Sequence, residues 1–265
     1  MELIINFTDT EWQCAVSESG KLIRYFKIDP VLHVGDKIIG RIIKKSPLPD
    51  SFFFEYMKDR TGLLIKAKGC KVGDKIRAEM TRHGDGAFKS PKFIPSGNDC
   101  PPAALYTIEK NNPFPNLISR HNITGIICNP SPAVRLLPFA PQLRTDPFDS
   151  ILKEEIAGLN DPVIVLSDGS RVIIEKTAAF TAIDIDSGSS CAAADAINEN
   201  VAREIIRQIV LRDIYGIIVI DFIGHSFHKN LKNAVEIMRN NRDSIKVVSV
   251  TRLNLVELIR ERQHE

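Results

Sequence analysis

The chain has 265 residues, of which 43% are hydrophobic and 26% charged, and such values are ordinary for a globular protein. This length allows two modest domains, or one domain with an insertion, around a sizeable core. The sequence has no apolar run as long as a membrane span and no basic N-terminal region of a signal peptide, so no membrane partner is expected. The five cysteines are scattered and form no Cys-x-x-Cys pair, which favours a cytoplasmic location and no zinc.

The net charge of +2 conceals an uneven distribution along the chain. Between Lys37 and Lys92 there are 14 Lys or Arg residues against 6 Asp or Glu residues, a balance of +8, so the rest of the chain carries −6. A basic segment beside an acidic one suits a protein that holds a polyanion next to a cation site. Basic residues also decorate ordinary solvated surfaces, and charge alone leaves both interpretations open.

The N-terminal part of the chain is predicted to be rich in β-structure. Residues 1–30 contain two short alternating strands with a turn at Ser19-Gly20, which predicts a β-hairpin that packs on the α/β part further along the chain. Residues 31–95 follow as several short strands between glycine turns, and their basic excess favours a small barrel of the OB type. Such barrels hold single-stranded nucleic acid by stacking bases on aromatic rings beside cationic side chains.

Three consecutive phenylalanines, Phe52, Phe53 and Phe54, lie in one predicted strand of this barrel. Alternate rings fill the core of a barrel, so at least one of the three must face outward, and we favour Phe53. Cationic side chains of the same segment are candidates for phosphate contacts, which give affinity without sequence preference. These candidates are Lys44, Lys45, Arg60, Lys66, Arg82 and Lys89.

The remaining elements predict a linker and then an α/β domain. Residues 96–118 are rich in Pro and Asn and are interpreted as a linker, and residues 119–265 as the α/β domain. Within that domain the sequence predicts a strand and short helix at 123–137, a helix at 149–159 and a hairpin at 163–176. A helix at about 228–241, a strand at 245–250 and a last helix at 255–262 follow.

Residues 178–224 form the centre of this domain and are predicted to be a strand, a helix and a second strand. Side chains Ile197, Val201, Ile205 and Ile209 recur at steps of four, which indicates one buried helix face. A unit of this length almost always crosses over right-handed and makes its two strands parallel. Asp184 and Asp221 then end adjacent strands at the same sheet edge, roughly 4.8 Å apart if no strand lies between them.

Aspartates inside apolar runs need a physical reason, because ionised carboxylates resist burial unless they are paired or bind a cation. Each aspartate alone is explained as well by a turn or a helix cap. Two of them at matching ends of adjacent strands favour a hard divalent cation, since magnesium accepts one or two carboxylates and keeps waters. Asp186, two residues beyond Asp184, points to the same side of a regular strand.

Other polar residues near this unit are open to two interpretations. His225 and His228 follow Asp221 closely enough to act as general acids or bases, but they also suit the start of a helix. Arg212 and Asp213 are expected to pair with each other or to cap the preceding helix, and Arg212 is a further candidate for a phosphate contact.

Three segments resemble the ribonuclease E/G family of bacterial endoribonucleases. They are TAIDIDSG at 181–188, AREIIRQIVLRDIYGIIVIDFI at 202–223 and VTRLNLVELIRER at 250–262, against the family's IDxNSG, RQLRLRDxxG and IVIDFIDM. The resemblance implies that Asp184 and Asp221 are magnesium ligands, and that Asp186 stands where the family has a supporting Asn. Gly224 replaces the second Asp of IDFIDM.

The barrel segment carries a second part of the resemblance. SFFFEYMKDRTGLL at 51–64 is similar to the ribosomal S-one type of OB domain in that family, which implies that Phe53 stacks on bases. Leu63 stands where the family has a second stacking aromatic residue. We find no GLIVRTA-like run, which in the family senses the RNA 5′ monophosphate, and no Cys-x-x-Cys zinc link. The chain therefore resembles a short family member without the sensor, and zinc-linked oligomers are not expected.

Together these observations predict a mixed α+β and α/β fold, in which an OB-type barrel lies near the N-terminus beside an α/β nuclease-like domain. The expected function is a magnesium-dependent endoribonuclease that acts on single-stranded RNA, with manganese as a substitute metal. Asp184, Asp186 and Asp221 are its expected catalytic residues. The alternatives are an RNA-binding protein that has kept the fold but not the activity, and a structural partner in a larger RNA-processing assembly.

Overall fold

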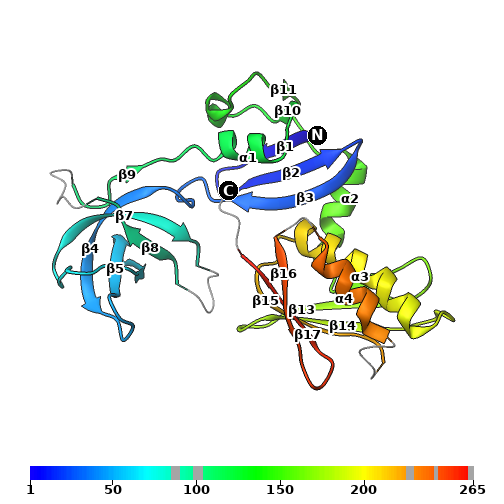
Figure 1. Cartoon of the computed structure of the whole chain (residues 1–265). Coiled ribbons are helices and arrows are strands. Elements are labelled where there is room, and N and C mark those ends of the chain that lie inside the picture. The colour runs from blue at the N-terminus through cyan, green and yellow to red at the C-terminus, as the bar shows by residue number, and fades with distance from the viewer. Residues whose placement is uncertain (85–89, 98–103, 225–229, 242–243, 262–265) are drawn as a thin grey trace.

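The computed structural model describes residues 1–84, 90–97, 104–224, 230–241 and 244–261. In this part of the chain the strands form a barrel and two further sheets, with helices packed on both of those sheets (Figure 1). The predicted combination of an OB-type barrel with an α/β part is confirmed. None of the helices in these ranges combines the length and the apolar composition that crossing a membrane requires.

The barrel is built from consecutive strands: β4 (Lys37–Lys45), β5 (Phe52–Met57), β6 (Arg60–Leu64), β7 (Lys75–Arg82) and β8 (Lys92–Pro95). Their order is β5-β6-β8-β7-β4, and β4 also pairs with β5, which closes the barrel. Strands β6 and β8 run parallel, whereas the other barrel pairs are antiparallel. Gly40 permits the closure, because a Cβ at this position would lie 2.3 Å from the carbonyl oxygen of Glu55.

The second sheet joins the N-terminus to later parts of the chain. Its strands, in the order β11-β10-β1-β2-β3, are β11 (Gln142–Leu143), β10 (Gly125–Cys128), β1 (Glu2–Phe7), β2 (Trp12–Glu18) and β3 (Lys21–Ile28). The sequence interpretation missed strand β2, and the Ser19-Gly20 turn joins β2 to β3. Strands β10 and β11, which we assigned to the α/β domain, belong to this sheet, and β10 pairs with β1 in parallel.

The expected linker at 96–118 contains regular structure. Strand β9 (Ile108–Glu109) pairs with β4, and helix α1 (Phe114–Arg120) packs on the N-terminal sheet. The Phe114 ring is buried and stacks on Trp12, with ring centroids 5.8 Å apart. Buried apolar rings need core partners, and this requirement overrides the Pro- and Asn-rich composition that predicted a loop. The short helix η1 (Pro132–Leu136) lies in the position predicted for it.

The third sheet has the order β12-β13-β14-β15-β17-β16. Its strands are β12 (Val163–Val165), β13 (Arg171–Lys176), β14 (Thr181–Asp186), β15 (Gly216–Asp221), β16 (Ile245–Val250) and β17 (Val256–Arg260). Helices α3 (Ala194–Leu211) and α4 (Lys232–Arg239) pack on one of its faces, and α2 (Ser150–Gly158) packs between α3 and the N-terminal sheet (Figure 1). Strands β14 and β15 are parallel, as the strand–helix–strand pattern predicted.

The two faces of this sheet differ because side chains alternate along each strand. Ile183, Ile185, Ile218 and Ile220 are buried in the core with Ile197, Val201, Ile205 and Ile209 of α3. The i+4 stripe of that helix is therefore its buried face, as predicted, and each such side chain contributes roughly 1.5–3 kcal/mol. The residues between them on the strands, including Asp184, Ile217 and Asp221, are exposed on the opposite face.

The predicted last helix at 255–262 is wrong, because the chain there forms strand β17 between β15 and β16. Val256 and Leu258 alternate into the core, whereas Glu257 and Ile259 face outward. Leu255, Leu258 and Ile259 also fit a helical period, so the local sequence is ambiguous. Pairing with β15 and β16 favours the strand, because β17 between them forms backbone hydrogen bonds along both of its edges.

A cluster of ion pairs joins the third sheet to the N-terminal sheet. Asp213, in the turn between α3 and β15, accepts hydrogen bonds from Arg24 of β3 at 2.9 Å and Arg260 of β17 at 3.2 Å. Both arginine side chains are only 2% exposed. Of the two expectations for Arg212 and Asp213, the pairing with each other is therefore wrong, whereas the capping is confirmed, because Arg212 is the C-cap residue of α3. Burial of two cations needs a shared anion, and Asp213 supplies it.

Candidate active site

Asp184 and Asp221 lie directly beside each other in the third sheet. They are a register pair of the parallel strands β14 and β15, and no strand lies between them. Adjacent strands are roughly 4.8 Å apart, so the two carboxylates lie side by side. They are on the sheet face opposite helices α3 and α4, which we call the open face. The prediction that these residues meet at one sheet edge is confirmed, because the buried α3 face fixes both the crossover and the register.

These two carboxylates have no counter-charge in the part of the chain that the structure describes. Neither makes a hydrogen bond or ion pair there, and both residues are exposed. Like charges directly opposite each other in a sheet are destabilising. The arrangement is thus unfavourable for the protein alone and favourable for a bound cation.

Asp186 differs from the other two aspartates because it already has partners. Its carboxylate forms an ion pair with Arg171 at 3.0 Å and accepts a hydrogen bond from the Gly188 amide at 2.8 Å. Arg171 lies opposite Asp186 in the antiparallel pair of β13 and β14. Sequence reasoning did not single out Arg171. The period of two along β13 places it on the open face, but only the register shows that it meets Asp186.

The buried side chain of Asn198 fixes the chain that follows Asp221. Its amide group donates hydrogen bonds to the carbonyl oxygens of Ile223 at 2.8 Å and Asn230 at 2.9 Å. Its oxygen accepts a hydrogen bond from the Ile223 amide at 3.1 Å. Gly224 is next in the chain, with φ of +96°, and a Cβ there would lie 2.8 Å from the Asn230 side chain. An Asp at position 224, as in the family motif, does not fit this conformation without strain.

Replacing Asn198 with Ala is expected to destabilise the protein by about 1–3 kcal/mol, because two carbonyl groups and one amide of partly buried residues lose their hydrogen-bond partner. Urea unfolding followed by circular dichroism measures this change. Asn200 lies on the same helix but is exposed, so Asn200→Ala is the matched control and should change stability by less than about 0.5 kcal/mol. Equal effects of the two substitutions would contradict the role of Asn198.

The outer surface of the barrel carries a row of register partners across its five strands. Lys44 pairs with Phe53, Phe53 with Leu63, Leu63 with Lys92, and Lys92 with Arg82. Phe53 is partly exposed between the buried Phe52 and Phe54, so it faces outward as the alternation predicted. We call these five residues the barrel row. Lys92 was not among the predicted contacts, and its place in the row follows only from the β6–β8 pairing.

The other predicted RNA contacts are placed less uniformly. Lys45, Arg60 and Lys66 are exposed on the barrel. Lys89, like His225 and His228, lies outside the described residues. The structure does not bring Arg212 to the aspartate pair, because α3 runs antiparallel to the strands and its C-terminal end lies at the opposite sheet edge from Asp221.

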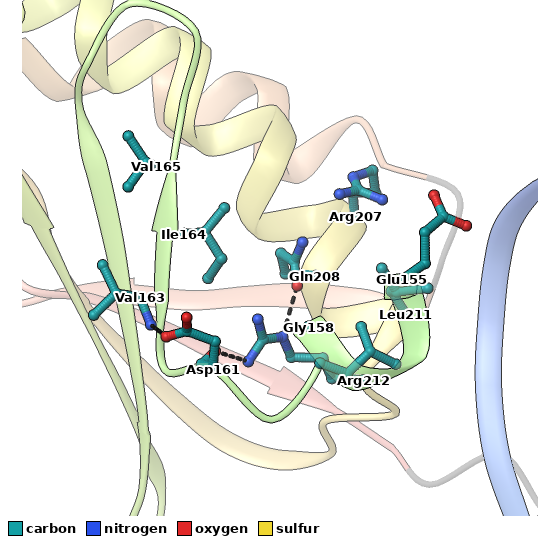
Figure 2. A pocket seen from close by; sticks show the side chains of 11 residues that line it. Glu155, Gly158, Asp161, Val163, Ile164, Val165, Arg207, Gln208, Leu211 and Arg212 are labelled. Atoms are coloured by element: carbon teal, nitrogen blue, oxygen red, sulfur yellow. Dashed lines mark hydrogen bonds between the residues drawn. The ribbon is translucent and has the colours of Figure 1, made fainter. Parts of the chain in front are cut away.

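Arg212 instead lines a hollow of about 310 Å³ between α2, α3 and β12 (Figure 2). Its guanidinium donates to Gln208 Oε1 at 2.6 Å and to the carbonyl oxygen of Asp161 at 2.7 Å. Burial lowers the pKa of Arg212, and the nearby carboxylates of Asp161 and Glu204 oppose that shift. These contacts give Arg212 a structural role at the end of α3.

The aspartate pair lies in a part of the chain that is similar in sequence to known proteins. Residues 145–263 match the model of the Ribonuclease E/G family. Ribonuclease E of Synechocystis sp. is 38% identical over 112 residues, which are 38% of this chain and 17% of that protein. Ribonuclease E/G-like protein, chloroplastic, of Arabidopsis thaliana is 36% identical over 126 residues, 42% of this chain and 12% of that protein.

Ribonuclease E of Escherichia coli is 37% identical over 107 residues, 37% of this chain and 10% of that protein. The predicted resemblance to the ribonuclease E/G family is confirmed for residues 145–263, which contain α2, the third sheet and its helices. The chain covers only a small part of these relatives' lengths. The family model does not extend over the barrel, whose relation to the family rests on the motif at 51–64.

Proposed function

We propose that this protein is a metal-dependent endoribonuclease that cleaves single-stranded RNA. The observation that carries the proposal is the in-register pair of Asp184 and Asp221, two exposed carboxylates without a counter-charge among the described residues, inside the region that matches the family. The ribonuclease names of the relatives supply the substrate class. The barrel row supplies cations and an aromatic ring of the kind that holds single strands.

The two carboxylates of Asp184 and Asp221 suit magnesium, which completes its coordination with waters and substrate phosphates, better than they suit a metal whose ligands all come from the protein. No group of three His, Cys, Asp or Glu residues within the described ranges is arranged to hold a metal ion. Magnesium commonly takes one or two carboxylates together with waters and substrate phosphates, and two carboxylates are what Asp184 and Asp221 offer. We therefore assign these two side chains as its ligands.

Other residues of the chain bind the RNA and position groups near the metal site. When bound, magnesium supplies Lewis-acid stabilisation of phosphate charge and a more acidic water. The cationic side chains of the barrel row, Lys44, Lys92 and Arg82, neutralise the RNA backbone, and Phe53 offers a ring for base stacking. Asp186 forms an ion pair with Arg171 at 3.0 Å. Its contribution to the site is to orient the Arg171 guanidinium on the open face.

The test is incubation of purified protein with a labelled circular single-stranded RNA in magnesium, in manganese and in EDTA. A circle has no ends, so only internal cleavage linearises it. We expect linear products with either metal and none with EDTA, and we expect the new ends to carry 5′-phosphate and 3′-hydroxyl groups. An intact circle under all three conditions would refute the proposal.

A second candidate function is RNA binding without cleavage. The specific observations in its favour are the Asp186–Arg171 ion pair, which occupies the position of the family's supporting Asn, and the positive φ of Gly224, at which the family's second Asp would be strained. Leu63 also takes the place of a stacking ring. This alternative predicts that the protein retains the circle on a filter with and without magnesium but never opens it.

A further inference from the structure

A hollow of about 150 Å³ lies between the barrel and the third sheet. Its walls come from the end of β7, from the turn between β13 and β14, and from the start of β15. Figure 1 shows that turn on the side of the sheet that faces the barrel. The residues around the hollow that carry charge or an aromatic ring are Arg82, His83, Lys176, Phe180 and Tyr215.

The described residues that line this hollow are cationic or neutral. Two permanent cations and a histidine line it, and no Asp or Glu lines it among the residues that the structure describes. The hollow beside α3 is different, because Glu155 and Asp161 line it together with Arg207 and Arg212 (Figure 2). A lining that presents Arg82, His83 and Lys176, and no carboxylate within the described ranges, is a favourable place for a polyanion.

The aromatic ring of Phe180 is presented by a rigid turn. The Thr177 hydroxyl donates to the carbonyl oxygen of Phe180 at 2.6 Å and accepts from the Phe180 amide at 3.1 Å. The Thr177 amide also donates to the same carbonyl oxygen, at 2.9 Å. Phe180 is nevertheless 38% exposed. An exposed ring on a fixed backbone loses little conformational entropy when it stacks on a ligand.

Tyr215, on the other side of the hollow, belongs to a turn that is also fixed. The Ile214 amide donates to the Ile209 carbonyl oxygen at 2.9 Å, which ends α3 tightly. Asp213 in the same turn is held by the two buried arginines described above. Both aromatic residues of the hollow thus stand on backbone that is set before any ligand arrives.

The hollow shares a residue with the barrel row and a strand with the aspartate pair. Arg82 is the last member of the barrel row and also lines the hollow. Ile217 lines the hollow too, and it lies on the same strand and the same face as Asp221, four residues earlier. Four residues of a strand span roughly 13 Å, a distance that a few nucleotides of single-stranded RNA bridge.

We propose that this hollow is a subsite for one nucleotide of the RNA strand, where a base stacks on Phe180 and a phosphate lies near Lys176 and Arg82. This inference rests on the proposed function and extends it, because it gives the strand a course from the barrel row to the aspartate pair. The hollow is smaller than the roughly 300–1,000 Å³ of pockets for whole small molecules, which suits a single base.

The test measures binding of a fluorescein-labelled 12-nucleotide oligouridylate by anisotropy in EDTA, where the proposed cleavage does not occur. Phe180→Leu keeps an apolar side chain but removes the flat ring, and we expect roughly tenfold weaker binding. Phe139 has the same exposed fraction of 38%, so Phe139→Leu is the matched control and should bind like the parent. Lys176→Gln should reduce the slope of log affinity against log salt by about 0.7, whereas Lys153→Gln on α2 should not.

A direct readout accompanies the affinities. Oligouridylate that carries 5-iodouridine, crosslinked by light and followed by trypsin digestion, should modify the peptides that begin at Thr177 and at Asp213, since they contain Phe180 and Tyr215. Thermal melting of each variant checks that it is folded.

The outcomes separate the two proposals. If Phe180→Leu binds like Phe139→Leu and neither peptide is crosslinked, the subsite is wrong even if the parent linearises circular RNA. If the parent binds and crosslinks there but never cleaves, the subsite stands and the proposed nuclease function fails. A parent that binds no RNA overturns both.

Discussion

Replacing Asp184 with Asn is expected to reduce RNA cleavage by about a thousandfold or more, because the site loses one of its two metal ligands and several kcal/mol of charge stabilisation. The fold should remain, since Asp184 is exposed and makes no contact that the substitution breaks among the described residues. In EDTA the variant should be more stable than the parent by about 0.2–1 kcal/mol, because the repulsion from Asp221 disappears. Single-turnover cleavage rates and urea unfolding measure the two effects.

Added magnesium provides a further contrast. It should raise the melting temperature of the parent, since a ligand that binds only the folded state stabilises it. It should leave Asp184→Asn nearly unchanged, and Asp221→Asn should behave in the same way. Asp146, whose exposed carboxylate pairs with Lys153 at the surface, provides the control variant Asp146→Asn, which should cleave like the parent. Cleavage by Asp184→Asn at the parental rate would remove this residue from the mechanism.

Replacing Asp213 with Asn should destabilise the protein by about 3–5 kcal/mol. The substitution keeps the shape of the side chain but leaves Arg24 and Arg260, each 2% exposed, without their shared anion. Such a loss is a large share of a typical folding free energy of about 5–15 kcal/mol. Urea denaturation at neutral pH measures it, and the midpoint should move to lower urea concentration.

The control for Asp213 is again Asp146→Asn, which breaks a surface ion pair and should cost at most about 1 kcal/mol. An Asp213→Asn variant that is as stable as Asp146→Asn would mean that the arginines find other partners or solvent. Because Tyr215 lies two residues beyond Asp213, the variant should also weaken oligouridylate binding under conditions in which it is still folded.

The centre of the candidate site was predictable because its physics is local. The i+4 stripe of α3 and the two apolar runs define a strand–helix–strand unit, and the handedness of that unit makes its strands parallel. Because Asp184 and Asp221 each end one of these two parallel strands, adjacency of the strands places the two side chains at the same edge of the sheet. The outward orientation of Phe53 followed in the same way from the period of two along β5.

What was missed depends on partners that are distant in sequence. Arg24 and Asp213 are separated by 189 positions, so no local pattern links them. The parallel pairing of β1 with β10 and the place of Arg171 beside Asp186 both depend on register, which a single strand does not encode. Strand β17 was mistaken for a helix because Leu255, Leu258 and Ile259 also fit a helical period, and the pairing with the neighbouring strands decides between the two structures.

Strand β17 comes later in the chain than every other strand of its sheet, yet it lies in the interior, between β15 and β16. During synthesis on the ribosome, the edge of β15 therefore remains uncovered until residues 256–260 have emerged. Uncovered strand edges are templates for pairing between nascent chains. A chain that is stalled or truncated before Val256 is thus expected to aggregate or to require a chaperone, although both proposed metal ligands have already been made.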